Sequence, residues 1–304
     1  MAPPLDNDRP LRNPGPPLGY ECLEIADRWL PPAVFKAGVR AGCQLAVSLM
    51  PERRANSEAY LRQISGSPAH RSEVVEHFSV FTESILERLR LSRGICPRFF
   101  LPESNHSREF EALCRSPRPV LFGTFHVGQS DILGCMLSDF GRRVALVRHR
   151  VANARDTRTM EAVFADKVKV LWINDTADFL YRFREAIDEG FSIGLQCDRV
   201  EYGGRVTAFH FLGAQRSFPT TIYRLSRIVG LPVAFAFAGQ PERDRGTPVI
   251  AGPIFYPEDR ADFGPASAAH FQQVLTGLEN YLKDHPFLWF NFGPLNPVHK
   301  TNEA

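Results

Sequence analysis

The chain has 304 residues, ample for a hydrophobic core, and its apolar fraction of 44% and charged fraction of 23% are those of an ordinary soluble globular protein. A formal net charge of +2 gives no reason to expect a nucleic-acid partner. The six cysteines are scattered, form no CxxC pair and have no histidine at metal-ligand spacing, so we expect reduced thiols, no disulfide framework and no metal site.

The chain begins with a segment that has little capacity to form a core. Residues 1–19 carry six prolines and few apolar residues, which predicts a disordered arm, and they lack the apolar stretch of a signal peptide. Residues 20–95 are predicted to form a helical segment, for which a position on a membrane surface is one of two interpretations. We expect this segment to pack as one domain with an α/β region over residues 96–304.

The most apolar predicted helix covers residues 33–50, and further helices are predicted at 54–66 and 71–92. Lys36 and Arg40 lie inside the first of these helices. Each charge would cost roughly 2.5–3.5 kcal/mol at the centre of a bilayer, so we do not expect the helix to span a membrane. A helix on the membrane surface and a plain core helix explain its pattern equally well.

After this helical region, apolar runs typical of strands alternate with helical patterns. Alternation of this kind predicts an α/β fold with a mostly parallel central sheet flanked by helices. Strands are predicted at 118–125, 143–148, 168–173, 191–197, 232–238 and 248–255, and helices at about 130–140, 153–165, 176–189, 218–229 and 266–284.

A histidine and an aspartate stand where the first of these strands passes into a helix. The apolar run ends at His126, and Gly128 and Ser130 lead to Asp131 at the start of the helical pattern. In open α/β sheets, ligands bind at the carboxyl ends of the strands. A loop at Gly128 would let the Asp131 carboxylate reach the imidazole and fix its tautomer, leaving the other nitrogen as a general base. A purely structural histidine is the alternative.

No obvious protein nucleophile accompanies this pair, because Ser130, the nearby hydroxyl, fails the GxSxG pattern: Ile132 stands where the second glycine would be. We therefore expect the hydroxyl or amine of a substrate to be the attacking group.

Arginines cluster around the next strand. Arg142 and Arg143 stand at its start, while Arg148 and Arg150 come at its end, and two or three of them at one sheet edge would bind phosphate or pyrophosphate. Solvated arginines are the alternative.

A second charged segment ends the fourth predicted strand. Asp198 and Arg199 lead into a loop that contains Gly203 and Gly204, which makes either a site edge or a salt bridge that closes a turn. Further on, three phenylalanines would either line a slot for an acyl chain or pack in the core; they are Phe209, Phe211 and Phe218.

The order of these motifs resembles the lysophospholipid acyltransferase superfamily, in particular its bacterial lipid A (lauroyl/myristoyl) acyltransferase branch. The resemblance runs from about residue 29 to 292. It rests on His-x4-Asp after an apolar strand, an arginine after the next strand, Asp198, a Gly-Gly-x-x-x-x-Phe-x-Phe-x-Gly segment and a closing His-Pro-x-x-Trp-Phe element at 285–290.

The resemblance implies a fold like that of the glycerol-phosphate and lysophospholipid acyltransferases, and transfer of a fatty acyl group from an acyl-carrier-protein or coenzyme A thioester. The acceptor would be a hydroxyl, or less often an amine, of a lipid or glycolipid. It also implies no bound cofactor or metal, and a peripheral location on the cytoplasmic face of a bacterial inner membrane or in the cytoplasm.

The same resemblance assigns roles to residues. His126 would be the general base and Asp131 its orienting partner, and Arg148 or Arg150 would bind a phosphate of the acceptor or donor. The remaining substrate-binding positions would be Asp198, Arg199, Gly203 and Gly204. A non-catalytic lipid- or acyl-carrier-binding protein and a thioesterase remain the alternatives.

Overall fold

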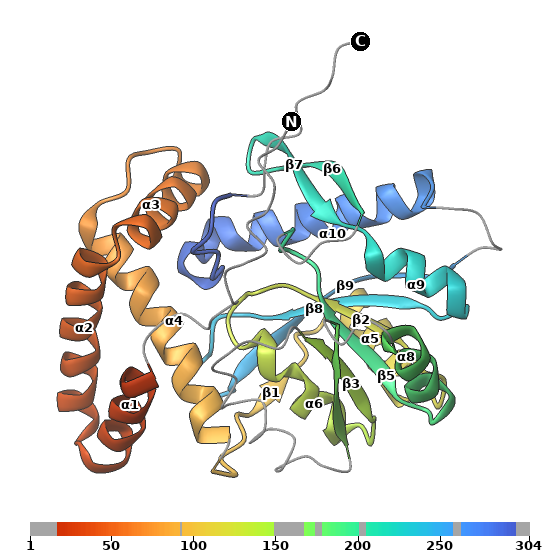
Figure 1. Ribbon diagram of the computed structural model, residues 1–304, viewed down its shortest axis with the longest axis horizontal. Helices are drawn as coiled ribbons and strands as arrows, with labels where there is room; N and C mark the ends of the chain where they lie inside the picture. Colours follow the sequence, from red (N-terminus) through yellow and green to blue (C-terminus); the bar gives the residue numbers. More distant parts are fainter. Residues whose placement is uncertain are drawn as a thin grey trace.

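The computed structural model describes residues 17–91, 93–148, 167–173, 178–200, 205–257 and 263–295. In this part of the chain, a seven-stranded sheet with the strand order β1-β9-β8-β2-β5-β3-β4 lies at the centre of the molecule (Figure 1). The strands are β1 (Phe99–Phe100), β2 (Leu121–Thr124), β3 (Val144–Arg148), β4 (Val168–Trp172), β5 (Ser192–Gln196), β8 (Val233–Ala238) and β9 (Thr247–Phe255).

The sheet is mostly parallel. Strands β8, β2, β5, β3 and β4 run in one direction, β9 is antiparallel to β8, and β1 pairs with β9 in parallel. An antiparallel hairpin of β6 (Val206–Phe211) and β7 (Ala214–Pro219) stands apart from this sheet. The predicted α/β class with a mostly parallel sheet is confirmed.

Helices cover both faces of the sheet. On one face, α5 (Asn105–Arg115) and α6 (Leu133–Asp139) bury their apolar residues against Val120, Phe122 and Val144. On the other face, α8 (Phe179–Asp188), α9 (Thr221–Val229) and α10 (Pro265–Asp284) pack against the residues that alternate with these, such as Leu121 and Ile193. This two-sided burial explains why the central strands are apolar throughout.

Four helices precede the sheet and form one side of the molecule (Figure 1): α1 (Pro17–Trp29), α2 (Pro32–Leu49), α3 (Pro51–Ser65) and α4 (Arg71–Leu91). Their core is continuous with that of the sheet, because one cluster of buried apolar side chains includes Val47, Val74 and Phe271. In the described part of the chain, no helix has the length and apolar character needed to cross a membrane.

The elements differ from the sequence predictions in a few places. The predicted arm lies outside the described residues as far as residue 16, and residues 17–19 form the start of α1. The helix predicted at 153–165 also lies outside them. The helix predicted at 218–229 begins at Thr221, because the residues before it complete β7. Helix α5 was not expected.

Candidate functional site

His126 and Asp198 meet at the carboxyl edge of the sheet because of strand register. Strands β2 and β5 are parallel neighbours in which Thr124 pairs with Gln196. His126 lies two residues beyond Thr124, and Asp198 lies two residues beyond Gln196. The two strands therefore deliver the imidazole and the carboxylate to the same place, although 72 residues separate them in the chain.

The carboxylate of Asp198 accepts hydrogen bonds from His126 and Trp289 at this edge. Its Oδ1 lies 2.7 Å from Nδ1 of His126, and its Oδ2 accepts the backbone N–H of His126 at 2.9 Å and the indole N–H of Trp289 at 2.8 Å. Asp198 is only 2% exposed. Burial raises the pKa of the carboxyl, but His126, Arg199 and the Trp289 N–H together outweigh burial, and the pKa lies below its ordinary value.

This arrangement fixes the tautomer of His126. The Asp198 carboxylate has no proton to give, so Nδ1 of His126 carries the proton and donates it. Among the described residues, Nε2 has no hydrogen-bond partner, and no hydroxyl or thiol is bonded to the ring. The side chain is 14% exposed. An imidazole in this state accepts a proton at Nε2.

The segment after α10 holds the His126 loop in place. The N–H of Phe290 donates to His126 O at 2.8 Å, and the N–H of Gly128 donates to Leu288 O at 2.9 Å. Gly128 has a φ of 50°, and a Cβ atom there would lie 2.6 Å from Ala238 O. Only glycine fits this position, so the loop after His126 has one permitted course.

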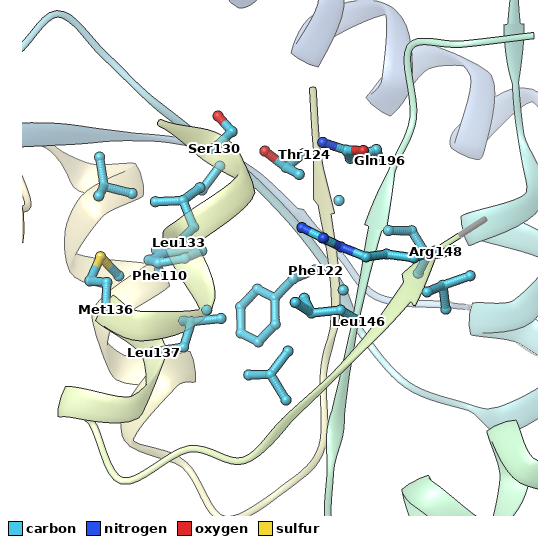
Figure 2. A pocket seen from close by; sticks show the side chains of 18 residues that line it. Phe110, Phe122, Thr124, Ser130, Leu133, Met136, Leu137, Leu146, Arg148 and Gln196 are labelled. Carbon is cyan, nitrogen blue, oxygen red and sulfur yellow. The ribbon is translucent and has the colours of Figure 1, made fainter. Parts of the chain in front are cut away.

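A narrow pocket of about 60 Å³ lies between α6 and the face of β2, β5 and β3 (Figure 2), and it reaches the last residues of these strands but is not lined by His126 or Asp198. Polar groups gather at one end of it: Thr124, Gln196 and Arg148, which end their strands, and Ser130 of η1 (Ser130–Ile132). The rest is apolar and includes Phe110, Phe122, Leu133, Met136, Leu137 and Leu146.

One polar atom in this lining stands out. Oγ1 of Thr124 is buried and has no hydrogen-bond partner among the described residues. Buried hydroxyls are normally paired in folded proteins, so this oxygen marks a place where a ligand can supply the partner.

The arginines around β3 separate into two groups. Arg142 and Arg143 lie at the amino end of the strand, far from the carboxyl edge that carries His126. Arg142 is buried and donates to backbone carbonyls, while Arg143 lies over the ring of Phe191 at 3.9 Å. Arg148 ends the strand, and Figure 2 shows its side chain extending into the pocket. Of the arginines considered for an anion site, Arg142 and Arg143 thus lie at the opposite end of β3 from Arg148.

Of the remaining residues predicted for the site, the structure describes the side chain of Arg199 but not those of the others. Arg199 donates to Phe290 O at 3.4 Å and lies close enough to Asp198 to lower its pKa. The backbone of Asp131 lies in η1, but its side chain is outside the described part of the structure, as are Arg150, Gly203 and Gly204.

Of the two alternatives for Phe209, Phe211 and Phe218, a slot for an acyl chain or packing in the core, the structure supports the core, because all three rings are buried. Phe209 packs edge-on against Phe271 with ring centroids 5.0 Å apart, and Phe211 packs against Trp289 at 5.4 Å. None of the three lines the pocket between α6 and the sheet.

Asp198 and Trp289 hold the site together in a way that the sequence did not predict. Asp198 was expected to contact substrate rather than His126, and Trp289 was noted only as part of a closing motif.

The described residues contain no group of three or more His, Cys, Asp or Glu side chains arranged to hold a metal ion. The chain matches no protein-family model, and no curated protein matches it.

Proposed function

We propose that this protein is an acyltransferase that moves a fatty acyl group from an acyl-carrier-protein or coenzyme A thioester to a hydroxyl, or an amine, of a lipid or glycolipid. The observation that carries the proposal is the buried Asp198 carboxylate on Nδ1 of His126, which leaves Nε2 as a base to which no hydroxyl or thiol is bonded among the described residues. The resemblance of the motif order to the lipid A acyltransferase branch of the lysophospholipid acyltransferases supports it.

In the proposed reaction, Nε2 of His126 removes the proton from the acceptor hydroxyl as its oxygen attacks the thioester carbonyl. A tetrahedral oxyanion forms, and it collapses as the C–S bond breaks. The imidazolium returns its proton to the departing thiolate, so the products are an ester and a free thiol. Asp198 stabilises the imidazolium during the step.

The pocket between α6 and the sheet has the character that an acyl group needs. Its polar end, with the unpartnered Thr124 Oγ1, offers a hydrogen bond to a carbonyl oxygen, and its apolar end would take the chain. A single water needs about 10–15 Å³ of such space. The 60 Å³ present therefore suits the first few carbons of a chain.

Arg148 is the proposed phosphate ligand of the donor or acceptor, since it reaches the pocket from the same sheet edge. We assign supporting contacts with the substrate to Arg150, Arg199, Gly203 and Gly204.

We place the protein on the cytoplasmic face of the inner membrane, held there peripherally. Exposed apolar residues on the first two helices support this location, among them Trp29 and Leu49.

The test replaces His126 with Ala and measures transfer from acyl-carrier-protein and coenzyme A thioesters, together with the mass spectra of total lipids from expressing cells. Loss of the base should lower the rate by about 10² to 10⁴ and abolish a lipid species that is heavier by one acyl group. His210→Ala is the matched control, because His210 is exposed on the β6–β7 hairpin. Full transfer activity in His126→Ala would sink the assignment.

The same assay separates the alternatives. Free fatty acid released by the wild type without an acylated lipid would mean that water is the acceptor and the protein is a thioesterase. Lipid or carrier binding without turnover, unchanged in His126→Ala, would mean a non-catalytic binding protein.

A further inference from the structure

A cavity of about 350 Å³ lies between the loop after His126 and the helices α1, α2 and α4, which form one side of the molecule in Figure 1. Its lining includes Gly128 and Gln129 of that loop. Sites for small molecules range from about 300 to 1,000 Å³, so the cavity is large enough for a small polar ligand. It is much larger than the pocket between α6 and the sheet.

Five charged side chains of the described part of the chain line this cavity, and three of them are held in ion pairs. Arg90 of α4 pairs with Asp27 of α1 and, at 2.7 Å, with Glu87. These pairs join α1 to α4. They leave Lys36 of α2 and Glu83 of α4 as the other two charged residues of the lining.

Lys36 and Glu83 interact without forming an ion pair. Burial raises the pKa of the Glu83 carboxyl, and the charge of Lys36 opposes this rise. The ammonium and the carboxylate are nevertheless farther apart than the 4.0 Å of an ion pair, and neither has a hydrogen-bond partner among the described residues. Both residues are exposed, so a ligand in the cavity can reach each charge.

Gln129 adds a hydrogen-bond donor to the same cavity. Its Oε1 accepts the hydroxyl of Thr247 at 3.0 Å, and its side-chain N–H groups have no partner among the described residues. An ammonium and an amide donor suit an anionic group such as phosphate, while a carboxylate suits a cation. The cavity therefore matches a ligand that carries both charges.

An apolar groove of about 950 Å³ adjoins the cavity. Leu30 and Phe35 line both of them. Arg53 is the one charged residue of the groove in the described part of the chain, and Leu45 and Phe81 are among its apolar residues. A ligand with its charged end in the cavity has an apolar surface beside it for a hydrocarbon tail, and a charged head joined to such a tail is a lipid.

We propose that the cavity binds the zwitterionic headgroup of a lipid, with an ammonium on Glu83, a phosphate on Lys36 and Gln129, and the acyl chain in the groove. Phosphoethanolamine is such a headgroup, because only a short ethylene bridge separates its two charges. The inference rests on the proposed acyl transfer in naming the chemical class of the acceptor, but binding of the headgroup requires neither His126 nor a thioester.

The test measures binding by isothermal titration calorimetry. The probes are lauroyl lysophosphatidylethanolamine below its micelle concentration and the same lipid acetylated on nitrogen, which differs by the loss of the positive charge. The wild type should bind the unmodified lipid about fivefold more tightly, the upper end of what a solvent-accessible ion pair contributes. Glu83→Gln should remove this preference without changing the affinity for the acetylated lipid, and Lys36→Met should weaken both lipids by a similar factor.

Glu76→Gln is the matched control. Glu76 also lies on α4, but it does not line the cavity and pairs with Arg40 at 3.7 Å. Its replacement should leave the preference for the unmodified lipid unchanged, and thermal unfolding checks that each variant folds. His126→Ala should bind both lipids like the wild type, so a protein that transfers no acyl group but keeps the preference would refute the proposed function and support this site.

Two results would overturn the proposal. Equal affinity of the wild type for the two lipids, or a preference that survives in Glu83→Gln, would mean that Glu83 binds no ammonium. Glycerophosphoethanolamine has the headgroup and no chain. If it binds as tightly as the lysolipid, then the ligand is a soluble zwitterion and the groove takes no part in its binding.

Discussion

Asp198 controls both the position and the tautomer of His126. Replacing it with Asn keeps the size of the side chain and removes the charge. The Asn amide can donate a hydrogen bond to Nδ1, so the imidazole proton moves to Nε2. A histidine protonated at Nε2 cannot accept the proton of a substrate there. We expect Asp198→Asn to lower kcat by about 10² to 10⁴ with a smaller change in KM. Steady-state kinetics with a thioester donor measure both.

Asp131→Asn provides the comparison. The sequence predicts that Asp131 orients the imidazole, whereas in the structure Asp198 occupies Nδ1. If Asp131→Asn costs as much activity as His126→Ala, and Asp198→Asn leaves kcat near the wild-type value, then the sequence-based pairing is right and Asp198 only supports the fold.

The sequence suggests Asp131 and not Asp198 as the partner of His126 because residue spacing predicts only contacts between residues that are close in the chain. The step from His126 to Asp131 is local, so residue spacing and a glycine suffice to suggest it. The contact with Asp198 depends on β2 and β5 being neighbours and on Thr124 being paired with Gln196. Strand order and register arise from the packing of the whole sheet, and no local pattern encodes them.

At the scale of single elements, Arg142 secures the end of α5. Its guanidinium donates to Cys114 O at 3.0 Å and Leu113 O at 2.6 Å in the last turn of the helix, and to Ser192 Oγ at 2.7 Å in β5. The last carbonyls of a helix have no partners within it, so this buried side chain supplies them.

Arg142→Met should therefore lower the free energy of unfolding by about 3 kcal/mol or more, because it removes the charged donor from its buried acceptors Cys114 O and Ser192 Oγ. Its neighbour Arg143 is exposed and stacks on Phe191, so Arg143→Met should cost at most about 1 kcal/mol. Urea unfolding of the two variants measures this. Equal stability of the two would show that the carbonyls of α5 are satisfied without Arg142.

The elements with a strong local pattern could be predicted. The strands expected at 143–148 and 168–173 and the helix expected at 266–284 are each confirmed to within a residue or two. Helix α5 was missed although it carries a signal, since Ser104 accepts the N–H of Ser107 as an N-cap, and Phe110, Leu113 and Cys114 follow at helical spacing.

At the scale of the whole molecule, the segment after α10, which contains Trp289, joins the N-terminal helices to the edge of the sheet. His77 of α4 is fully buried, with Nε2 2.9 Å from Trp289 O and Nδ1 2.8 Å from Ser57 Oγ. Because a carbonyl only accepts, Nε2 carries the proton and Nδ1 accepts from Ser57. Trp289 in turn donates to Asp198, so the packing of α3 and α4 supports the candidate site.

This link makes the stability of the molecule sensitive to acid. Burial lowers the pKa of His77 to about 4, while in the unfolded chain it is ordinary for histidine, about 6.5. Between these values the unfolded chain binds the proton and the folded protein does not, so stability is lost as pH falls from about 6.5 toward 4. Going from pH 7 to pH 5 should cost about 2 kcal/mol through this residue.

Urea unfolding at both pH values, for the wild type and for His77→Gln, measures this loss. The variant should start less stable at pH 7 and lose about 2 kcal/mol less on acidification. His270, whose pKa burial also lowers, contributes in the same direction in both proteins and cancels in the comparison. An equal loss in both proteins would mean that His77 is not the group whose protonation opposes folding.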